Sequence, residues 1–238
     1  AFTDEWGVKY SKDGRKLLKA PQELKGCYSV KEGTRMICDE VFWYSCSLSN
    51  IVIPGSVTSI GNWAFKGCTS LSNIVIPNSV TSIGDWAFSD CTSLSNIVIP
   101  DSVTSIGEGA FSSCTSLSNI VIPDSVTNIG DDVFYQCSSL TSVVIPNSVT
   151  CVGDEAFCKC RSLSNIVIPN SVTSIGVSVF WGCSSLVNMD IPDSVTRIGD
   201  WAFVNCSNLS YDLKQELISR FGDELFKLPL HFPAFLKS

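Results

Sequence analysis

The sequence predicts a right-handed, strand-rich α/β solenoid with short helical turns, about eight coils long and capped at both ends. Three observations predict this fold class. Proline recurs at intervals of 23 residues from Pro54 to Pro192, and glycine keeps the same interval from Gly61 to Gly199. Phenylalanine, leucine and cysteine follow the same period. No insertion interrupts it. A fixed period of this length is typical of solenoids, in which each repeat buries its apolar face against the next.

Composition excludes several other classes of protein. Of the 238 residues, 45% are hydrophobic and only 16% are charged, which excludes disorder for the bulk of the chain. The formal net charge of −7 disfavours a nucleic-acid partner. No apolar run approaches the roughly 18 residues of a membrane span. The chain begins without the apolar segment of a signal peptide, and we expect that such a segment has been removed.

Residues 1–30 are expected to form an N-terminal capping segment with a hairpin. Eight of the sixteen basic residues lie within positions 1–40. The pair Asp13-Gly14, between Tyr10 and Leu17, is a strong hairpin signal. This charged segment would cover the apolar face of the first coil, as solenoid ends require.

Residues 31–210 are expected to form the solenoid, and residues 71–93 illustrate one unit. Leu71, Ile74 and Ile76 show the alternation of a strand with one buried face. Pro77 cannot donate to a ladder and ends that strand. A turn follows, and residues 80–83 form a second extended piece.

The rest of the unit predicts a short helical turn. Gly84 breaks the second extended piece, where it is expected to relieve the backbone. Asp85 is a good N-cap, and Ala87, Phe88 and Cys91 would share one buried helical face. On the same pattern, Ser112 is predicted to face solvent.

Residues 211–238 are expected to form a C-terminal capping helix and a tail. Apolar residues fall at helical spacing, with Asp212 as the expected cap, at Leu213, Leu217, Ile218, Phe221 and Leu225. The tail either lies across the last coil or touches a neighbouring chain, and the first is favoured. It holds the single histidine, His231, which is expected to be packed or solvated rather than catalytic.

The pattern LxxIxIPxSVTxIGxxAFxxC resembles the BspA-like class of leucine-rich repeats over about residues 31–210. The resemblance implies a leucine-rich-repeat solenoid from a cell-surface or secreted protein. The unit from Gly33 to Leu48 departs from the motif, since Lys31 replaces the proline and Cys38 the glycine. In this class the strand face is usually the concave one.

The cysteines are predicted to be mostly buried thiols. Seven of the twelve lie on the repeat, at Cys68, Cys91, Cys114, Cys137, Cys160, Cys183 and Cys206. Neighbouring rungs would lie within disulfide range, but their place on the buried face favours free thiols. The spacing Cys158-x-Cys160 is not that of a paired zinc motif.

Catalytic motifs are hard to find, so the sequence predicts no enzyme and no cofactor. There is no GxSxG motif and no second histidine for a triad. Acidic residues follow the glycines at Asp85, Glu108, Asp131, Asp154 and Asp200. Others follow the prolines at Asp101, Asp124 and Asp193. Capping and turn formation explain both columns. Stacked carboxylates could instead hold calcium, although no known ligand loop is present.

The outward strand face is the candidate binding surface. The ligand-contacting residues are predicted to be Asn73, Val75, Asn96, Val98, Asn119, Val121, Val144, Asn165 and Val167, with Ser142 and Asn188 continuing the polar column and Asp190 ending the valines. Such a surface suits a protein or glycan ligand, such as a host or matrix component. Valine copied merely as a strand former is the alternative. We expect a monomeric, extracellular or cell-surface adhesion-type protein; a self-assembling structural element is the alternative.

Overall fold

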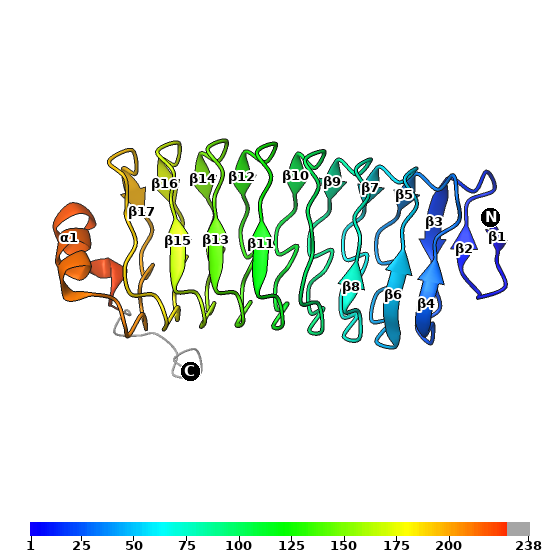
Figure 1. Ribbon diagram of the computed structural model, residues 1–238, viewed down its shortest axis with the longest axis horizontal. Helices are drawn as coiled ribbons and strands as arrows, with labels where there is room; N and C mark the ends of the chain where they lie inside the picture. The colour runs from blue at the N-terminus through cyan, green and yellow to red at the C-terminus, as the bar shows by residue number, and fades with distance from the viewer. Residues whose placement is uncertain (228–238) are drawn as a thin grey trace.

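The computed structural model describes residues 1–227 as a single row of stacked coils (Figure 1). The coils stand side by side in a nearly straight line, with the N-terminal strands at one end and α1 at the other. This architecture is the strand-rich solenoid that the repeat predicts. The predicted tail and His231 lie outside the described residues.

Two columns of short parallel strands run the length of the stack. The first column contains β4 (Gly26–Ser29), β6 (Leu48–Val52), β8 (Asn73–Ile74), β11 (Asn119–Val121), β13 (Ser142–Val144) and β15 (Asn165–Val167). The second contains β3 (Lys16–Lys19), β5 (Met36–Ile37), β7 (Ser59–Ile60), β9 (Ser82–Ile83), β10 (Ser105–Ile106), β12 (Asn128–Ile129), β14 (Cys151–Val152), β16 (Ser174–Ile175) and β17 (Arg197–Ile198). Each paired residue meets its equivalent in the next coil, as Asn119 meets Ser142 and Ser82 meets Ser105.

The N-terminal end is closed by antiparallel strands. β1 (Phe2–Thr3) pairs with β2 (Lys9–Tyr10), and β2 pairs with β3 across the predicted turn at Asp13-Gly14. The Tyr28 hydroxyl donates to Asp4 Oδ2 at 2.6 Å and lies 2.6 Å from the Tyr10 hydroxyl. This hydrogen-bonded cluster ties the first strand to the coil beneath it.

The core is a ladder of inward side chains. Eight phenylalanines, from Phe42 to Phe203, are fully or almost fully buried and stack with neighbouring ring centroids 5.0–5.9 Å apart. The inward leucines, isoleucines and valines of the strands surround them in one continuous cluster. Losing such a ring costs about 3–5 kcal/mol in other proteins, so this ladder carries much of the stability.

The predicted helical turn is wrong: the segment is a non-helical turn ladder. Two residues in each coil have left-handed backbone, such as Trp86 at φ 54° and Asp90 at φ 60°. Three alternate N–H groups of this coil donate to carbonyls of the next coil: Trp86 to Glu108 at 2.6 Å, and Phe88 and Asp90 to Ala110 and Ser112 at 2.8 Å. These bonds satisfy groups that a helix would have paired internally.

Because the segment is not helical, helical spacing mispredicts its faces. Ser112 is buried at 2% exposure rather than facing solvent. Later residues at the equivalent position, Cys158, Trp181 and Val204, form a second small apolar cluster. The buried assignment of Ala87, Phe88 and Cys91 is nevertheless confirmed.

The glycine after the second strand allows close contact between coils. Its φ is not left-handed, contrary to the expectation that it relieves the backbone. A Cβ on Gly84 would lie 2.5–2.6 Å from atoms of Asn62 and Gly61 in the preceding coil. Gly130 differs, because its nearest neighbour would lie 3.8 Å away.

The second strand column opens between β10 and β12. These strands belong to separate sheets, and Figure 1 shows them further apart than their neighbours. Elsewhere the glycine N–H donates to the carbonyl of the isoleucine or valine before the equivalent glycine in the preceding coil, as from Gly107 to Ile83 at 2.9 Å. Within residues 1–227, Gly130 makes no such bond. We call this place the open joint, between Ile106 and Gly130.

The C-terminal end is closed by α1 (Tyr211–Phe221) and a 3₁₀ turn, η1 (Asp223–Leu225). Ser210 rather than Asp212 caps the helix, accepting the Leu213 N–H at 3.4 Å. Leu213 and Leu217 are buried as predicted. The Arg220 guanidinium donates to the carbonyls of Ile191 and Pro192 at 2.6 and 3.0 Å, which fixes the helix to the last coil.

Candidate functional site

The first strands carry a stripe of solvent-exposed valines. Because side chains alternate along a strand, the aliphatic residue on each side of the outward valine is buried and the valine itself points into solvent. The exposed fractions are 79% at Val75, 77% at Val98, 74% at Val121, 62% at Val144 and 52% at Val167. The strand phase read from the sequence is therefore correct.

The stripe starts one coil earlier than the sequence analysis placed it. Val52 stands at the same position and is 51% exposed. Its surroundings, Ile51-Val52-Ile53-Pro54, show the same motif, so the repeat already contained the signal. We define the valine stripe as Val52, Val75, Val98, Val121, Val144 and Val167. Asp190 ends it with an exposed charge.

Polar side chains run beside the valine stripe. Asn73, Asn96, Asn119, Asn165 and Asn188 are exposed, and Ser142 is half-buried. Asn96 and Asn119 donate to the serine hydroxyl that precedes each of them, at 3.4 and 3.3 Å. The asparagine amides thus lie next to the valines, and the structure brings the predicted site residues together on one face.

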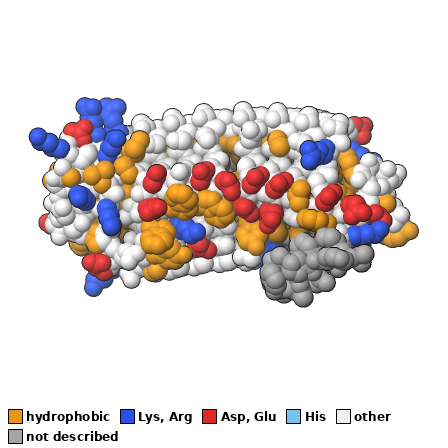
Figure 2. Space-filling model, turned by 180° about the vertical axis from the view of Figure 1, so that it is seen from behind, with side chains coloured by type: hydrophobic (Ala, Val, Ile, Leu, Met, Phe, Trp, Pro, Cys, Tyr) orange, Lys and Arg blue, Asp and Glu red, His pale blue; other side chains and the backbone are white. Residues whose placement is uncertain are grey.

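The acidic residues form a column elsewhere. Figure 2 shows Asp and Glu side chains in a row along the length of one face. The residues after the glycines were predicted to cap helical turns, and this prediction is wrong. Asp85 Oδ1 instead accepts the N–H of Glu108 in the next coil at 3.0 Å, and Asp131 and Asp154 accept equivalent bonds at 2.8 and 2.7 Å. Asn62 does the same at 2.8 Å. We call these bonds the side-chain staples.

Burial and neighbouring carboxylates raise the pKa of acidic residues beside this column. Partial burial raises the pKa of Asp132 to about 6, and the charges of Glu155, Glu108, Asp131 and Asp154 add to the shift. Burial and Asp154 also raise the pKa of Glu155. The charge of Lys159 opposes the shift at Glu155 in part.

The seven repeated cysteines are buried, as predicted, and all twelve are free thiols. Each repeated thiol donates to a phenylalanine carbonyl of the preceding coil, as from Cys91 Sγ to Phe65 O at 3.2 Å. Burial raises the pKa of Cys91, Cys114 and Cys137 well above that of a free thiol, and that of Cys68 to about 12. These groups act as small core side chains rather than as nucleophiles.

Within the described residues, no three His, Cys, Asp or Glu side chains are grouped so that they could hold a metal ion. In the same part of the chain no helix is long and apolar enough to cross a membrane.

The sequence and the fold both match known repeat proteins. The profile of the BspA type leucine rich repeat region matches residues 35–163 and 127–228, in six copies. No curated protein matches the chain significantly. The structure is similar to a leucine rich repeat protein of T. pallidum, with a TM-score of 0.69 and 28% identity, over 90% of this chain and 92% of that one.

Two further solved structures are similar. One is a leucine-rich repeat protein from Eubacterium ventriosum, with a TM-score of 0.65 and 24% identity, over 96% of this chain and 51% of that one. The other is a leucine-rich repeat protein from Bacteroides ovatus, with a TM-score of 0.53 and 29% identity, over 88% of this chain and 67% of that one. The chain therefore spans about half the length of the Eubacterium protein. With most of its length matched, the chain belongs to the BspA-type leucine-rich repeat family.

Proposed function

We propose that the protein is a non-catalytic binding protein that holds a protein or glycan ligand against the valine stripe. The observation that carries the proposal is the exposure of valines in register on consecutive coils, up to 79% at Val75. Contiguous apolar surface of this kind is typical of interaction sites, whereas isolated exposed apolar residues are ordinary. The asparagines beside it supply donors and acceptors that would orient the ligand.

The surface is uncharged until Asp190, which bears on the kind of ligand. Binding there would depend on apolar burial and on hydrogen bonds to amides. Salt screens charges and leaves apolar burial nearly untouched, so affinity should change little between low and moderate ionic strength. We place this ligand outside the cell or at its surface, the setting that the family resemblance implies.

The first prediction is that replacing Val98, Val121 and Val144 together by lysine abolishes binding of a ligand found in a glycan and matrix-protein screen. The loss of stability should be small, because these side chains point into solvent and surface substitutions usually stay within about 0.5 kcal/mol each. Binding is measured by titration calorimetry and folding by thermal melting.

The matched control places lysine at Thr104, Thr127 and Thr150. These threonines belong to the same three coils, are exposed, and lie at the second strand column. The control adds the same charge but should leave binding intact. Equal loss of binding in both triple variants would show a general charge effect and contradict the proposal.

A self-assembling element is the second candidate function, favoured by the even spacing of the stripe. Two copies of the chain share one coil pitch, so their valine stripes would match along their whole length. Sedimentation equilibrium separates the two candidates. A monomer at high concentration, which we expect, leaves self-assembly without support.

A further inference from the structure

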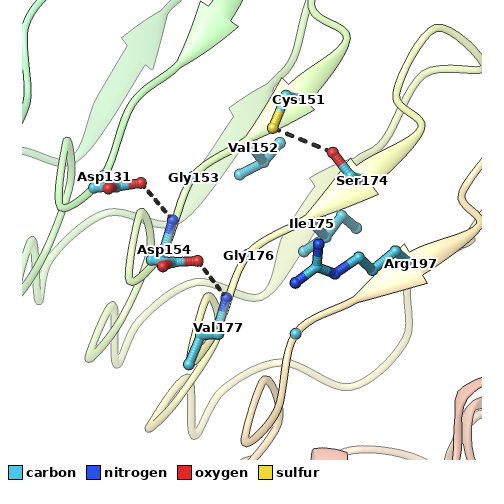
Figure 3. Close-up of a pocket in the computed structure, with 11 residues that line it drawn as sticks. Asp131, Cys151, Val152, Gly153, Asp154, Ser174, Ile175, Gly176, Val177 and Arg197 are labelled. Atoms are coloured by element: carbon cyan, nitrogen blue, oxygen red, sulfur yellow. Dashed lines mark hydrogen bonds between the residues drawn. The ribbon is translucent and has the colours of Figure 1, made fainter.

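A hollow beside the side-chain staples contains three departures from the repeat. Among the seven second-column strands from β7 to β17, the first residue is serine or asparagine in five but Cys151 on β14 and Arg197 on β17. The residue after the glycine is Asp, Asn or Glu in six coils but Val177 in the seventh. These three substitutions lie on separate coils, yet all of them line one hollow of about 200 Å³ (Figure 3).

Folding does not explain the departures at Val177 and Arg197. Val177 has no side-chain acceptor, so its coil gives up the staple that Asp131 and Asp154 provide to the coils after them. Arg197 is exposed, and within residues 1–227 its guanidinium makes no ion pair or hydrogen bond. Neither side chain adds a hydrogen bond or an ion pair within residues 1–227.

The hollow presents opposite charges on its two sides. In Figure 3 the Arg197 side chain extends from β17 toward Gly176, and Asp154 lies on the other side of that glycine. The two groups form no salt bridge, so they stand more than 4.0 Å apart, the limit for an ion pair. Asp154 Oδ1 accepts the Val177 N–H, while its second oxygen has no hydrogen bond within the described chain.

The walls and the size of the hollow limit what it can hold. The half-buried Val177 supplies apolar surface and Gly153 and Gly176 supply bare backbone, whereas the side chains of Val152 and Ile175 are buried in the core. Its volume lies below the 300–1,000 Å³ of pockets for drug-sized ligands. The occupant is therefore small.

We propose that this hollow binds a small zwitterion, an α-amino acid with a short apolar side chain. The ligand carboxylate pairs with the Arg197 guanidinium, which is charged at every physiological pH. The ligand ammonium pairs with the free oxygen of Asp154. The short side chain lies against Val177, where a carboxylate at position 177 would have repelled the ligand carboxylate.

Three probes of nearly equal size test the proposal. L-Alanine carries both charges, propionate lacks the ammonium and ethylammonium lacks the carboxylate. Each is titrated into the protein and followed by amide NMR shifts at Gly153, Gly176 and Val177. Alanine should bind at least tenfold more tightly than either of the others. Equal shifts with all three, or none with alanine, would overturn the proposal.

Two variants assign the charges. Arg197→Gln should weaken alanine binding at least tenfold, whereas the control Arg161→Gln should not change it. Asp154→Asn should weaken alanine binding but spare propionate, and it keeps an oxygen for the staple, as Asn62 already does. An unchanged alanine affinity in Asp154→Asn would leave only an anion site and contradict the zwitterion.

A chemical readout confirms the place. The Ser174 hydroxyl donates to Cys151 Sγ at 3.2 Å, and Cys151 is exposed at the hollow. Alanine should slow alkylation of Cys151 by iodoacetamide but not that of Cys46, which is exposed elsewhere. Equal rates with and without alanine at both cysteines would place any binding outside the hollow.

Discussion

Gly107 and Gly130 occupy the same position of the repeat but meet different surroundings. A Cβ on Gly107 would lie 2.4–2.5 Å from Gly84 and Asp85, including backbone atoms that cannot move away. A Cβ on Gly130 would meet its nearest neighbour at 3.8 Å, which is ordinary contact. The glycine column is therefore a requirement of coil spacing that holds at every joint except the open one.

The second prediction compares these two glycines. Gly107→Ala should destabilise the protein by about 1–3 kcal/mol, because the coils must move apart to admit the methyl group. Gly130→Ala should have little effect. Denaturant unfolding of both variants measures the difference, and similar losses would show that glycine serves another purpose at this position.

The third prediction concerns Asp132, whose pKa is raised to about 6 from the ordinary value of 3.8. Between these two values the folded state binds more protons than the unfolded state, so stability falls as the pH rises from about 4 to 6. Asp132→Asn should therefore raise the melting temperature at pH 7 and change it little near pH 4. Asparagine also tolerates the left-handed φ of 57° at this position.

The control for Asp132 is Asp101→Asn, at an exposed turn after Pro100. It should leave the melting temperature unchanged at both pH values. A stabilisation of Asp132→Asn that is the same at pH 4 and pH 7 would mean that the ionisation of Asp132 in its partly buried site is not its cause.

At the scale of elements, the open joint coincides with Glu108, the single glutamate in the column of residues that form the staples. Asp39, Asn62, Asp85, Asp131 and Asp154 each accept an N–H from the next coil. Glu108 makes no such bond to Asp131 within residues 1–227. Its side chain is one methylene longer, which misplaces the carboxylate for a bond that the shorter residues make.

The fourth prediction is that Glu108→Asp closes the open joint. A restored staple to the Asp131 N–H should add about 1 kcal/mol to the free energy of unfolding. Gly130→Ala, harmless in the parent chain, should then become destabilising in the Glu108→Asp background. A double-mutant cycle measures this coupling, and strict additivity would show that the glutamate does not hold the joint open.

Strands could be predicted from sequence far better than the turn ladder. The alternation of Ile74, Val75 and Ile76 fixes which side chain is buried, because successive strand residues point to opposite faces. The left-handed positions contain Trp86, Glu155 and Lys159 among others, none of which favours that backbone. Bonds between coils hold it there, and no local pattern reveals bonds to a residue 22 positions away.

The two candidate surfaces also differ in how well the sequence predicts them. The valine stripe repeats, so the motif of one unit carries the signal for each of its valines. The hollow at Val177 and Arg197 was missed, because its signal is the departure of single residues from a repeat. Aligning the seven units position by position would have exposed these departures, although only the structure shows that they lie together.

At the scale of the whole molecule, stability should be lowest at the ends, because an end coil has a single neighbouring coil. Cys206 lies in the last coil and is 6% exposed, whereas Cys160 lies within the stack and is fully buried. Both thiols have a pKa raised by burial, so alkylation must wait for local opening.

The fifth prediction is that Cys206 reacts with a thiol reagent at least tenfold faster than Cys160 under native conditions. Pulsed alkylation followed by peptide mass spectrometry measures both rates in one sample. The exposed Cys27, Cys46 and Cys151 serve as internal standards that react at once. Equal rates at Cys160 and Cys206 would mean that the molecule opens only as a whole.

The unbroken 23-residue repeat means that the number of coils sets the length of the molecule. Each coil adds one strand spacing, about 4.8 Å, except at the open joint. The distance from the hairpin at one end to α1 at the other is therefore set chiefly by the number of coils. A partner that touched both ends would tolerate many point substitutions but would detect the gain or loss of a single unit.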